Sequence, residues 1–215
     1  DLVGYFESDH KLAMVTTRQS FIVPDDDFNH DILFYEHMQP GKNADNSAIS
    51  CGSGVIYRRS AIEHIEGFQT WNVVEDLYTT YILHSKNYTS YYVNKSYTRG
   101  TAPQDLSNIY KQRGTWALDT LRMFFRKSPF IKRGLSFRQR MHYIELSWAY
   151  IVSAIGITIL FLLPPVTLIL NKHIISNEVW YPFFIGPSLL AILMFYYVLS
   201  GRVFSTSQFC AGLSP

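Results

Sequence analysis

The chain has 215 residues, of which 47% are apolar and 17% are charged, and its formal net charge is +2. That length allows one or two domains, and so small a net charge argues against a nucleic-acid partner. The two cysteines, Cys51 and Cys210, are too few and too far apart for a disulfide framework or a zinc site. Charged residues crowd the first 140 positions and become rare after them. This asymmetry predicts a soluble part joined to a membrane part.

The first hundred residues have the composition of alternating strands and short helices. We expect helices at 2–8, 28–38 and 58–65, and loops at 39–46 and 100–104. A strand with its exit loop is expected at 11–23, small residues leading into a strand at 49–57, and a further strand at 88–93. The run Asp25-Asp26-Asp27 contains the Asp-x-Asp pattern with which many nucleotide-sugar transferases hold a divalent metal. Because it follows Pro24 and precedes a predicted helix, the cap of that helix is the simpler interpretation.

An acidic pair, Glu75 and Asp76, lies between the apolar run 71–74 and a predicted helix at 77–84. Leu77, Tyr81 and His84 share one face of that helix at i, i+4, i+7 spacing. Carboxylates at the start of a helix interact favourably with its dipole. Taken alone, the pair is therefore more typical of a helix start than of a catalytic base.

Residues 105–126 are expected to form an amphipathic helix. Gln112 and Trp116 are four residues apart, so they share a face and can approach one ligand, with Arg113 beside them. A membrane-surface helix with a Trp anchor is an equally good interpretation of the same residues. The predicted apolar stripe comprises Leu106, Ile109, Tyr110, Ala117, Leu121, Phe124 and Phe125.

A basic collar interleaved with aromatic residues follows, and two long apolar runs come after it. The collar comprises Arg122, Arg126, Lys127, Lys132, Arg133, Arg138 and Arg140. It suits an anionic lipid surface better than nucleic acid, because the apolar runs 144–170 and 180–200 follow at once. Each run has the roughly 20 residues that span a bilayer, although Pro164-Pro165 predicts a kink or an interruption. The positive-inside rule puts the collar and the N-terminal half in the cytosol.

Three short motifs in this order resemble those of the membrane-embedded family 2 glycosyltransferases, most closely the bacterial cellulose synthase catalytic subunits. The Thr-Glu-Asp motif of the family is present as Val74-Glu75-Asp76. Its Gln-x-x-Arg-Trp motif is present as the segment 112–116, Gln-Arg-Gly-Thr-Trp, and its Phe-Phe-Cys-Gly-Ser motif as the segment 49–53, Ile-Ser-Cys-Gly-Ser. The resemblance covers almost the whole chain.

The resemblance implies a fold and its divisions. We expect an α/β part, the C-terminal half of a GT-A-type glycosyltransferase domain, at 1–104. Amphipathic interfacial helices are expected at 105–143, an α-helical transmembrane hairpin at 144–200, and a truncated cytosolic tail at 201–215. The chain is thus expected to be a fragment, inactive alone, of a multi-pass protein of the plasma or inner membrane.

The resemblance also implies roles. Asp76, beside Glu75, is expected to be the general base that deprotonates the acceptor hydroxyl in an inverting single displacement. Expected substrate contacts are Gln112 and Arg113 at the departing diphosphate, Trp116 beneath the terminal acceptor sugar, and Cys51, Gly52 and Ser53 on the acceptor side. Thr115 stands where the family usually has Arg, so one contact is lost unless Arg113 substitutes.

The expected partners are a UDP-sugar donor, with UDP-glucose favoured, a growing polysaccharide, the lipid bilayer and accessory synthase subunits, with no nucleic acid. Mg²⁺ or Mn²⁺ is expected in the full-length protein, on ligands upstream of Asp1. The leading interpretation is a processive synthase. The alternatives are a non-catalytic membrane scaffold or translocation component, and a non-processive lipid-linked sugar transferase.

Overall fold

The computed structural model of the protein describes residues 2–23, 29, 31–171 and 186. Its elements are α1 (Gly4–Ser8), β1 (Leu12–Phe21), the π-helix η2 (Leu33–Met38), α2 (Gln39–Ala44), β2 (Val55–Tyr57), α3 (Arg59–His64), α4 (Glu75–Ser85), β3 (Thr89–Gly100), α5 (Leu106–Arg126) and α6 (Phe137–Leu170). The mixed α/β class predicted for the first half is confirmed.

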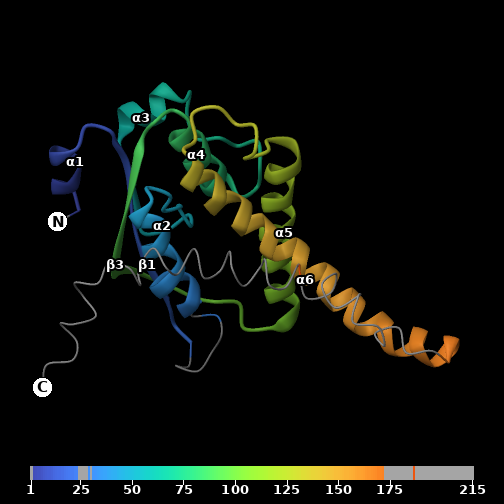
Figure 1. The fold of residues 1–215 in the computed structure, drawn as a ribbon. Coiled ribbons are helices and arrows are strands. Elements are labelled where there is room, and N and C mark those ends of the chain that lie inside the picture. The colour runs from blue at the N-terminus through green and yellow to red at the C-terminus, as the bar shows by residue number, and fades with distance from the viewer. Residues whose placement is uncertain (1, 24–28, 30, 172–185, 187–215) are drawn as a thin grey trace, which may run out of the picture.

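A small mixed sheet lies at one side of the molecule, with strand order β2-β1-β3. The central strand β1 is antiparallel to β2 and parallel to β3. Figure 1 shows α1 on the outer side of the sheet, and α2, α4 and α5 on the other side. The strand predicted at 88–93 extends to Gly100, because β3 pairs with β1 as far as the partners Phe21 and Gly100.

The segment 39–46 corrects the sequence prediction of a loop. Its first six residues form α2, which continues directly from η2. Pro40 lies in the first turn of α2, where a proline is tolerated. The buried side chain of Gln39 holds this turn, since its amide donates to Ile49 O (2.7 Å) and accepts from Ile49 N (3.1 Å). The proposed cap at Asp25–Asp27 lies outside the described residues.

Helix α4 forms the centre of the main core. The predicted face of Leu77, Tyr81 and His84 is buried, as expected. Leu77 and Tyr81 pack in one cluster with Met123 of α5 and Tyr143 of α6. Because α4 lies against both of these helices, the residues at its start are fixed relative to the long helices that follow.

Helix α5 has the predicted bounds but buries a different face. Tyr110 is 72% exposed and Phe125 71% exposed, although both belong to the predicted apolar stripe. The buried residues of α5 are Asp119, Thr120 and Met123. Partners elsewhere in the chain, described below, stabilise the buried carboxylate, and hydrophobic periodicity cannot report such partners.

Helix α6 has 34 residues and is not interrupted by Pro164 and Pro165. Its beginning is anchored to the domain by a buried ion pair between Lys42 Nζ and Glu145 Oε2 (3.0 Å). Its far end projects from the body (Figure 1), and its most apolar stretch is not buried. Among the described residues, α6 alone is long and apolar enough to cross a membrane. The run predicted as a second span lies outside the described residues except for residue 186, so the hairpin stays a prediction.

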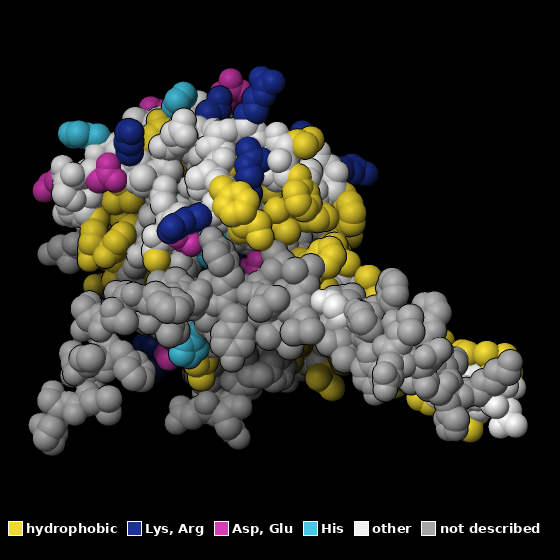
Figure 2. All heavy atoms as spheres, viewed as in Figure 1, with side chains coloured by type: hydrophobic (Ala, Val, Ile, Leu, Met, Phe, Trp, Pro, Cys, Tyr) yellow, Lys and Arg dark blue, Asp and Glu magenta, His cyan; other side chains and the backbone are white. Residues whose placement is uncertain are grey.

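Hydrophobic and basic side chains lie beside one another on the face shown in Figure 2. Around the turn between α5 and α6, the exposed apolar residues are Phe125, Phe130, Ile131 and Phe137. The predicted basic collar covers the same stretch of chain. This arrangement suits the boundary between water and lipid.

Candidate active site

The carboxylate of Asp76 is the central group of the site. Glu75 and Asp76 are the first two residues of α4, so the acidic pair begins the helix that was predicted to follow it. Asp76 Oδ1 accepts a hydrogen bond from Leu77 N (2.6 Å). Burial raises the pKa of Asp76 to about 6, and the neighbouring charge of Glu75 adds to the rise. Glu75 itself is exposed, so the two acids have different environments.

The loop that carries Cys51, Gly52 and Ser53 lies directly against this carboxylate. Gly52 has a φ of +80°, and a Cβ atom there would be 3.1 Å from Asp76 Oδ2. Only glycine combines that backbone conformation with so close an approach. Burial raises the pKa of the Cys51 thiol to about 12, with a further contribution from Asp76, so the thiol is protonated at neutral pH.

A cavity of about 190 Å³ brings together four of the predicted residues, Asp76, Cys51, Arg113 and Trp116. The Arg113 guanidinium lies 5.0 Å from the centre of the Trp116 ring, in cation–π geometry. Arg113 Nη2 also donates to both carboxylate oxygens of Asp31, each at 2.9 Å. The cavity therefore holds a carboxylate, a guanidinium and an indole in one small space.

The other predicted residues lie at the edges of this arrangement. Gly52 and Glu75 line a neighbouring cavity of about 600 Å³, which also reaches Asp76. Gln112 is half-buried on α5 and is not among the residues that line these two cavities, so a ligand shared by Gln112 and Trp116 stays a prediction. Ser53 Oγ instead accepts from Gln19 Nε2 (2.7 Å).

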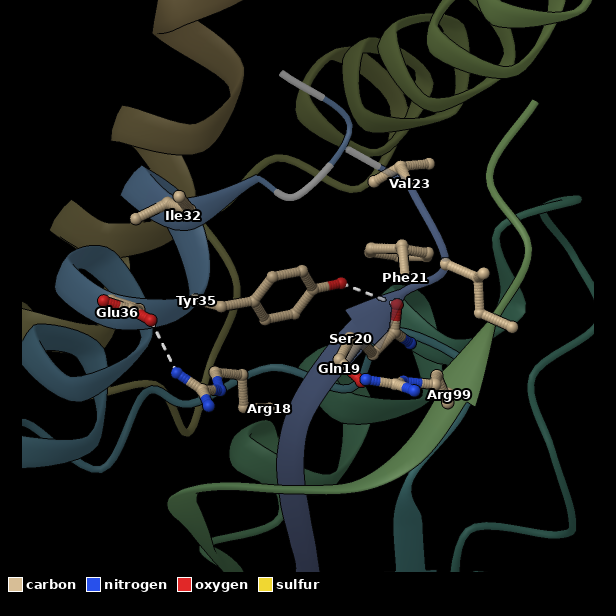
Figure 3. Close-up of a pocket in the computed structure, with 10 residues that line it drawn as sticks. Arg18, Gln19, Ser20, Phe21, Val23, Ile32, Tyr35, Glu36 and Arg99 are labelled. Carbon is tan, nitrogen blue, oxygen red and sulfur yellow. Dashed lines mark hydrogen bonds and ion pairs between the residues drawn. The ribbon is translucent and has the colours of Figure 1, made fainter. Parts of the chain in front are cut away.

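Gln19, Tyr35, Asp31 and Tyr150 also line the Asp76 cavity, and sequence reasoning missed them. Tyr35 donates from its hydroxyl to Gln19 Oε1 (2.7 Å), and Gln19 Nε2 donates to Cys51 O (2.7 Å). Figure 3 shows Tyr35 and Gln19 at a further cavity, of about 390 Å³, which they also line. No pattern marks these residues, because a polar side chain at the end of a strand or in a helix is common.

Thr115 lies at the position where the resemblance leads one to expect Arg, and its side chain bonds to the backbone of its own helix. Its hydroxyl donates to Lys111 O (2.9 Å), one turn earlier. Arg113 lines the Asp76 cavity and Thr115 does not. A positive charge is thus present near Asp76, but it comes from a different position on α5.

The described residues contain no group of three or more His, Cys, Asp or Glu side chains that could hold a metal ion. Glu75 and Asp76 are a pair without a third such ligand. The residues described in this structure therefore do not by themselves build a divalent-cation site. The divalent metal expected in the full-length protein stays a prediction, and the Asp25–Asp27 run lies outside the described part of the chain.

Comparison with known proteins gives a consistent result. Residues 12–201 match the family described as glycosyl transferase family group 2. The cellulose synthase catalytic subunit (UDP-forming) of Pseudomonas fluorescens is 32% identical over 151 residues, which are 66% of this chain and 20% of that protein. Cellulose synthase 1 of Komagataeibacter xylinus is 31% identical over 160 residues, 69% of this chain and 10% of that protein. The corresponding subunit of Komagataeibacter sucrofermentans is 30% identical over 154 residues, 66% of this chain and 20% of that protein. The chain thus spans a fifth or less of the length of these relatives.

Proposed function

This chain belongs to glycosyltransferase family 2 and is related to cellulose synthase catalytic subunits, and we propose that it supplies the catalytic base and the acceptor platform of a processive inverting β-glycosyltransferase. The observation that carries the proposal is the cavity in which Asp76, Arg113 and Trp116 meet. A scaffold has no use for a partly buried carboxylate with a raised pKa beside a guanidinium and an indole.

Asp76 is the general base of the proposed reaction. The acceptor hydroxyl gives its proton to the carboxylate as its oxygen attacks the anomeric carbon of the donor. The bond from that carbon to the diphosphate breaks at the same time, and the electron pair leaves with the nucleoside diphosphate. A pKa of about 6 suits this role, because the group is ionised at pH 7 yet basic enough to accept a proton. One displacement inverts the anomeric configuration, so a single base is sufficient.

The acceptor sugar stacks on Trp116, whose indole ring suits the apolar face of a pyranose. Cys51, Gly52 and Ser53, in the loop that lies against Asp76, contact the acceptor as well. Arg113 and Gln112 of α5 stabilise the charge that develops on the departing diphosphate. In the structure Asp31 binds Arg113, which keeps the guanidinium oriented toward the cavity.

The donor is a UDP-sugar, and UDP-glucose is the proposed substrate because the relatives are named as UDP-forming cellulose synthases. Mg²⁺ or Mn²⁺ bound to the parent protein would neutralise charge on the diphosphate. The residues that would hold this ion are not among those that the structure describes. Since the chain spans a fifth or less of its relatives, we propose that turnover requires the parent protein and that this chain alone is inactive.

Helix α6 and the basic collar would place the site at a membrane surface. We propose that α6 crosses the bilayer, that 105–143 lies at its cytosolic face, and that the glycosyltransferase part, 1–104, is cytosolic. The growing polysaccharide then leaves Trp116 toward the membrane, where accessory subunits of the synthase could receive it. The support is the exposed apolar length of α6 and the position of the collar directly before it.

The test is polymer formation by the full-length parent in membrane vesicles with Mg²⁺ and a panel of UDP-sugars, beside Asp76→Asn. Incorporation of one sugar into long polymer, lost in Asp76→Asn, is the expected result and names the donor. Transfer of single sugars to lipid would favour a non-processive enzyme. A well-folded parent that incorporates no sugar would favour a non-catalytic scaffold, the second candidate. Thr115 in place of Arg, with its hydroxyl bonded to its own helix, is the observation that favours the scaffold.

A further inference from the structure

A buried acid in α5, Asp119, has no role in the function proposed above. Its side chain is 1% exposed, although it lies in the middle of an amphipathic helix. A buried carboxylate is unfavourable unless it is paired and hydrogen-bonded. Asp119 Oδ2 accepts from Val74 N (2.8 Å), and Asp119 Oδ1 lies 3.2 Å from Arg122 Nη1. Its backbone oxygen also accepts from Asn72 Nδ2 (3.0 Å).

The residues that Asp119 binds, Asn72 and Val74, immediately precede Glu75 and Asp76 in the chain. Val74 is the N-cap of α4, and its apolar side chain makes no capping hydrogen bond. The backbone N–H of Val74 donates to the carboxylate of Asp119, which lies on another helix. Two hydrogen bonds, through Val74 and Asn72, therefore tie the segment before Asp76 to one residue of α5.

The same helix carries the other two groups of the cavity. Trp116 lies three residues before Asp119 and Arg113 six residues before it, so all three lie along one side of α5. The distance from Asp76 to Arg113 and Trp116 thus depends on how the start of α4 is held against α5. We propose that Asp119 is a positioning residue that fixes the Asp76 carboxylate relative to Arg113 and Trp116. This inference rests on the proposed function for its effect on sugar transfer, but its effect on Asp76 is independent of turnover.

Loss of this link should release the first turn of α4 and let water reach Asp76. The ionisable groups that face Asp76 are Glu75 on α4, the Cys51 thiol and the Tyr57 hydroxyl, while the Asp31–Arg113 pair lines the same cavity. None of them is removed by a change at Asp119. Since burial is the largest cause of the raised pKa of Asp76, hydration should lower that pKa toward its ordinary value.

The experiment uses the full-length parent and compares Asp119→Ala with Asp119→Asn. Asp119→Ala should lower kcat about 10- to 100-fold, with little change in KM for the donor, because the base is displaced while donor contacts remain. Asp119→Asn keeps an oxygen that can accept from Val74 N, and should restore most of kcat. In parallel, labelling of Asp76 by a carbodiimide, read by peptide mass spectrometry against pH, reports its pKa without any turnover. The half-maximal pH should lie near 6 in the parent and lower in Asp119→Ala.

Tyr81→Phe is the matched control, because Tyr81 Oη donates to Lys127 O (2.6 Å) and so links the same two segments away from Asp76. It should leave the kcat–pH profile and the labelling midpoint unchanged. An Asp119→Ala protein with the parent's kcat and labelling midpoint overturns the proposal, and so does a Tyr81→Phe protein with the losses expected for Asp119→Ala.

If Asp119→Ala does not fold, Asn72→Ala removes the second link and is judged by the same two measurements, with smaller changes expected. A parent that transfers no sugar defeats the proposed function, while the labelling still decides the role of Asp119.

Discussion

Replacement of Asp76 by asparagine should abolish transfer and, at neutral pH, stabilise the folded protein. Burial raises the pKa of Asp76 from an ordinary value of 3.8 to about 6, so the folded state binds its proton more tightly than the unfolded chain does. Stability therefore falls as the pH rises between these two values. The difference is about 2 pKa units, and at 1.36 kcal/mol per unit the ionised carboxylate destabilises the fold by about 3 kcal/mol above pH 7. Asparagine has almost the same shape and never ionises.

The assay is thermal or chemical unfolding of the purified parent and of Asp76→Asn at several pH values from 4 to 8. The difference in free energy of unfolding should be small at pH 4 and should grow through pH 6 to about 3 kcal/mol in favour of Asp76→Asn. Glu63→Gln is the control, because Glu63 is exposed on α3 and lines neither cavity that Asp76 lines, so its replacement should leave the free energy of unfolding little changed. The transfer assay on the same samples should show activity only where Asp76 is present.

Two results would refute this reasoning. A stability difference that is constant from pH 4 to pH 8 would mean that burial does not perturb the ionisation of Asp76. An Asp76→Asn protein that is less stable than the parent at pH 8 would mean that the ionised carboxylate makes favourable contacts outweighing its burial. Either result would remove the argument that the base is tuned for proton abstraction near neutral pH.

Three further changes test the site and its anchoring. Gly52→Ala should lower transfer about tenfold or more, measured as initial rate, because its Cβ would lie 3.1 Å from Asp76 Oδ2 and its φ is +80°. Lys42→Met should lower the free energy of unfolding, measured by chemical denaturation, by about 3–5 kcal/mol, because Glu145 is left buried without its partner. Adding Glu145→Gln to this variant should recover much of the lost stability. Trp116→Ala should shorten the polymer products and raise the KM for acceptor about tenfold, whereas Trp116→Phe should largely preserve the product length and the KM. Unchanged product length in Trp116→Ala would exclude stacking at this residue.

Sequence alone located the helices and strands of this protein well where one local signal dominated. Asp105 caps α5 through its side chain, which accepts from Asn108 N (2.8 Å), and the predicted helix begins there. The acidic pair was correctly placed at the start of α4, because carboxylates favour that end of a helix. By contrast, a loop was predicted at 39–46, whereas its first six residues form α2, in which the buried side chain of Gln39 bonds to Ile49.

The candidate site divides in the same way. The motifs of the sequence contained Cys51, Asp76, Arg113 and Trp116, and the structure brings these four to one cavity. Gln112, from the same motif, is not among the residues that line this cavity, and its contact with the substrate stays a prediction. Hydrophobic periodicity states which residues share a face, but not which partner that face will meet.

The amino-acid sequence thus determined most of the elements, the family and the motif residues, because these depend on short-range propensities and on residue identity. The tertiary structure decided the buried face of α5, the partner of Arg113 and the link from Asp119 to Val74. Each of these is a contact between residues far apart in the chain, such as Arg113 with Asp31 and Asp119 with Val74 N. Such contacts form only after α4, α5 and the sheet have packed, so no local sequence pattern predicts them.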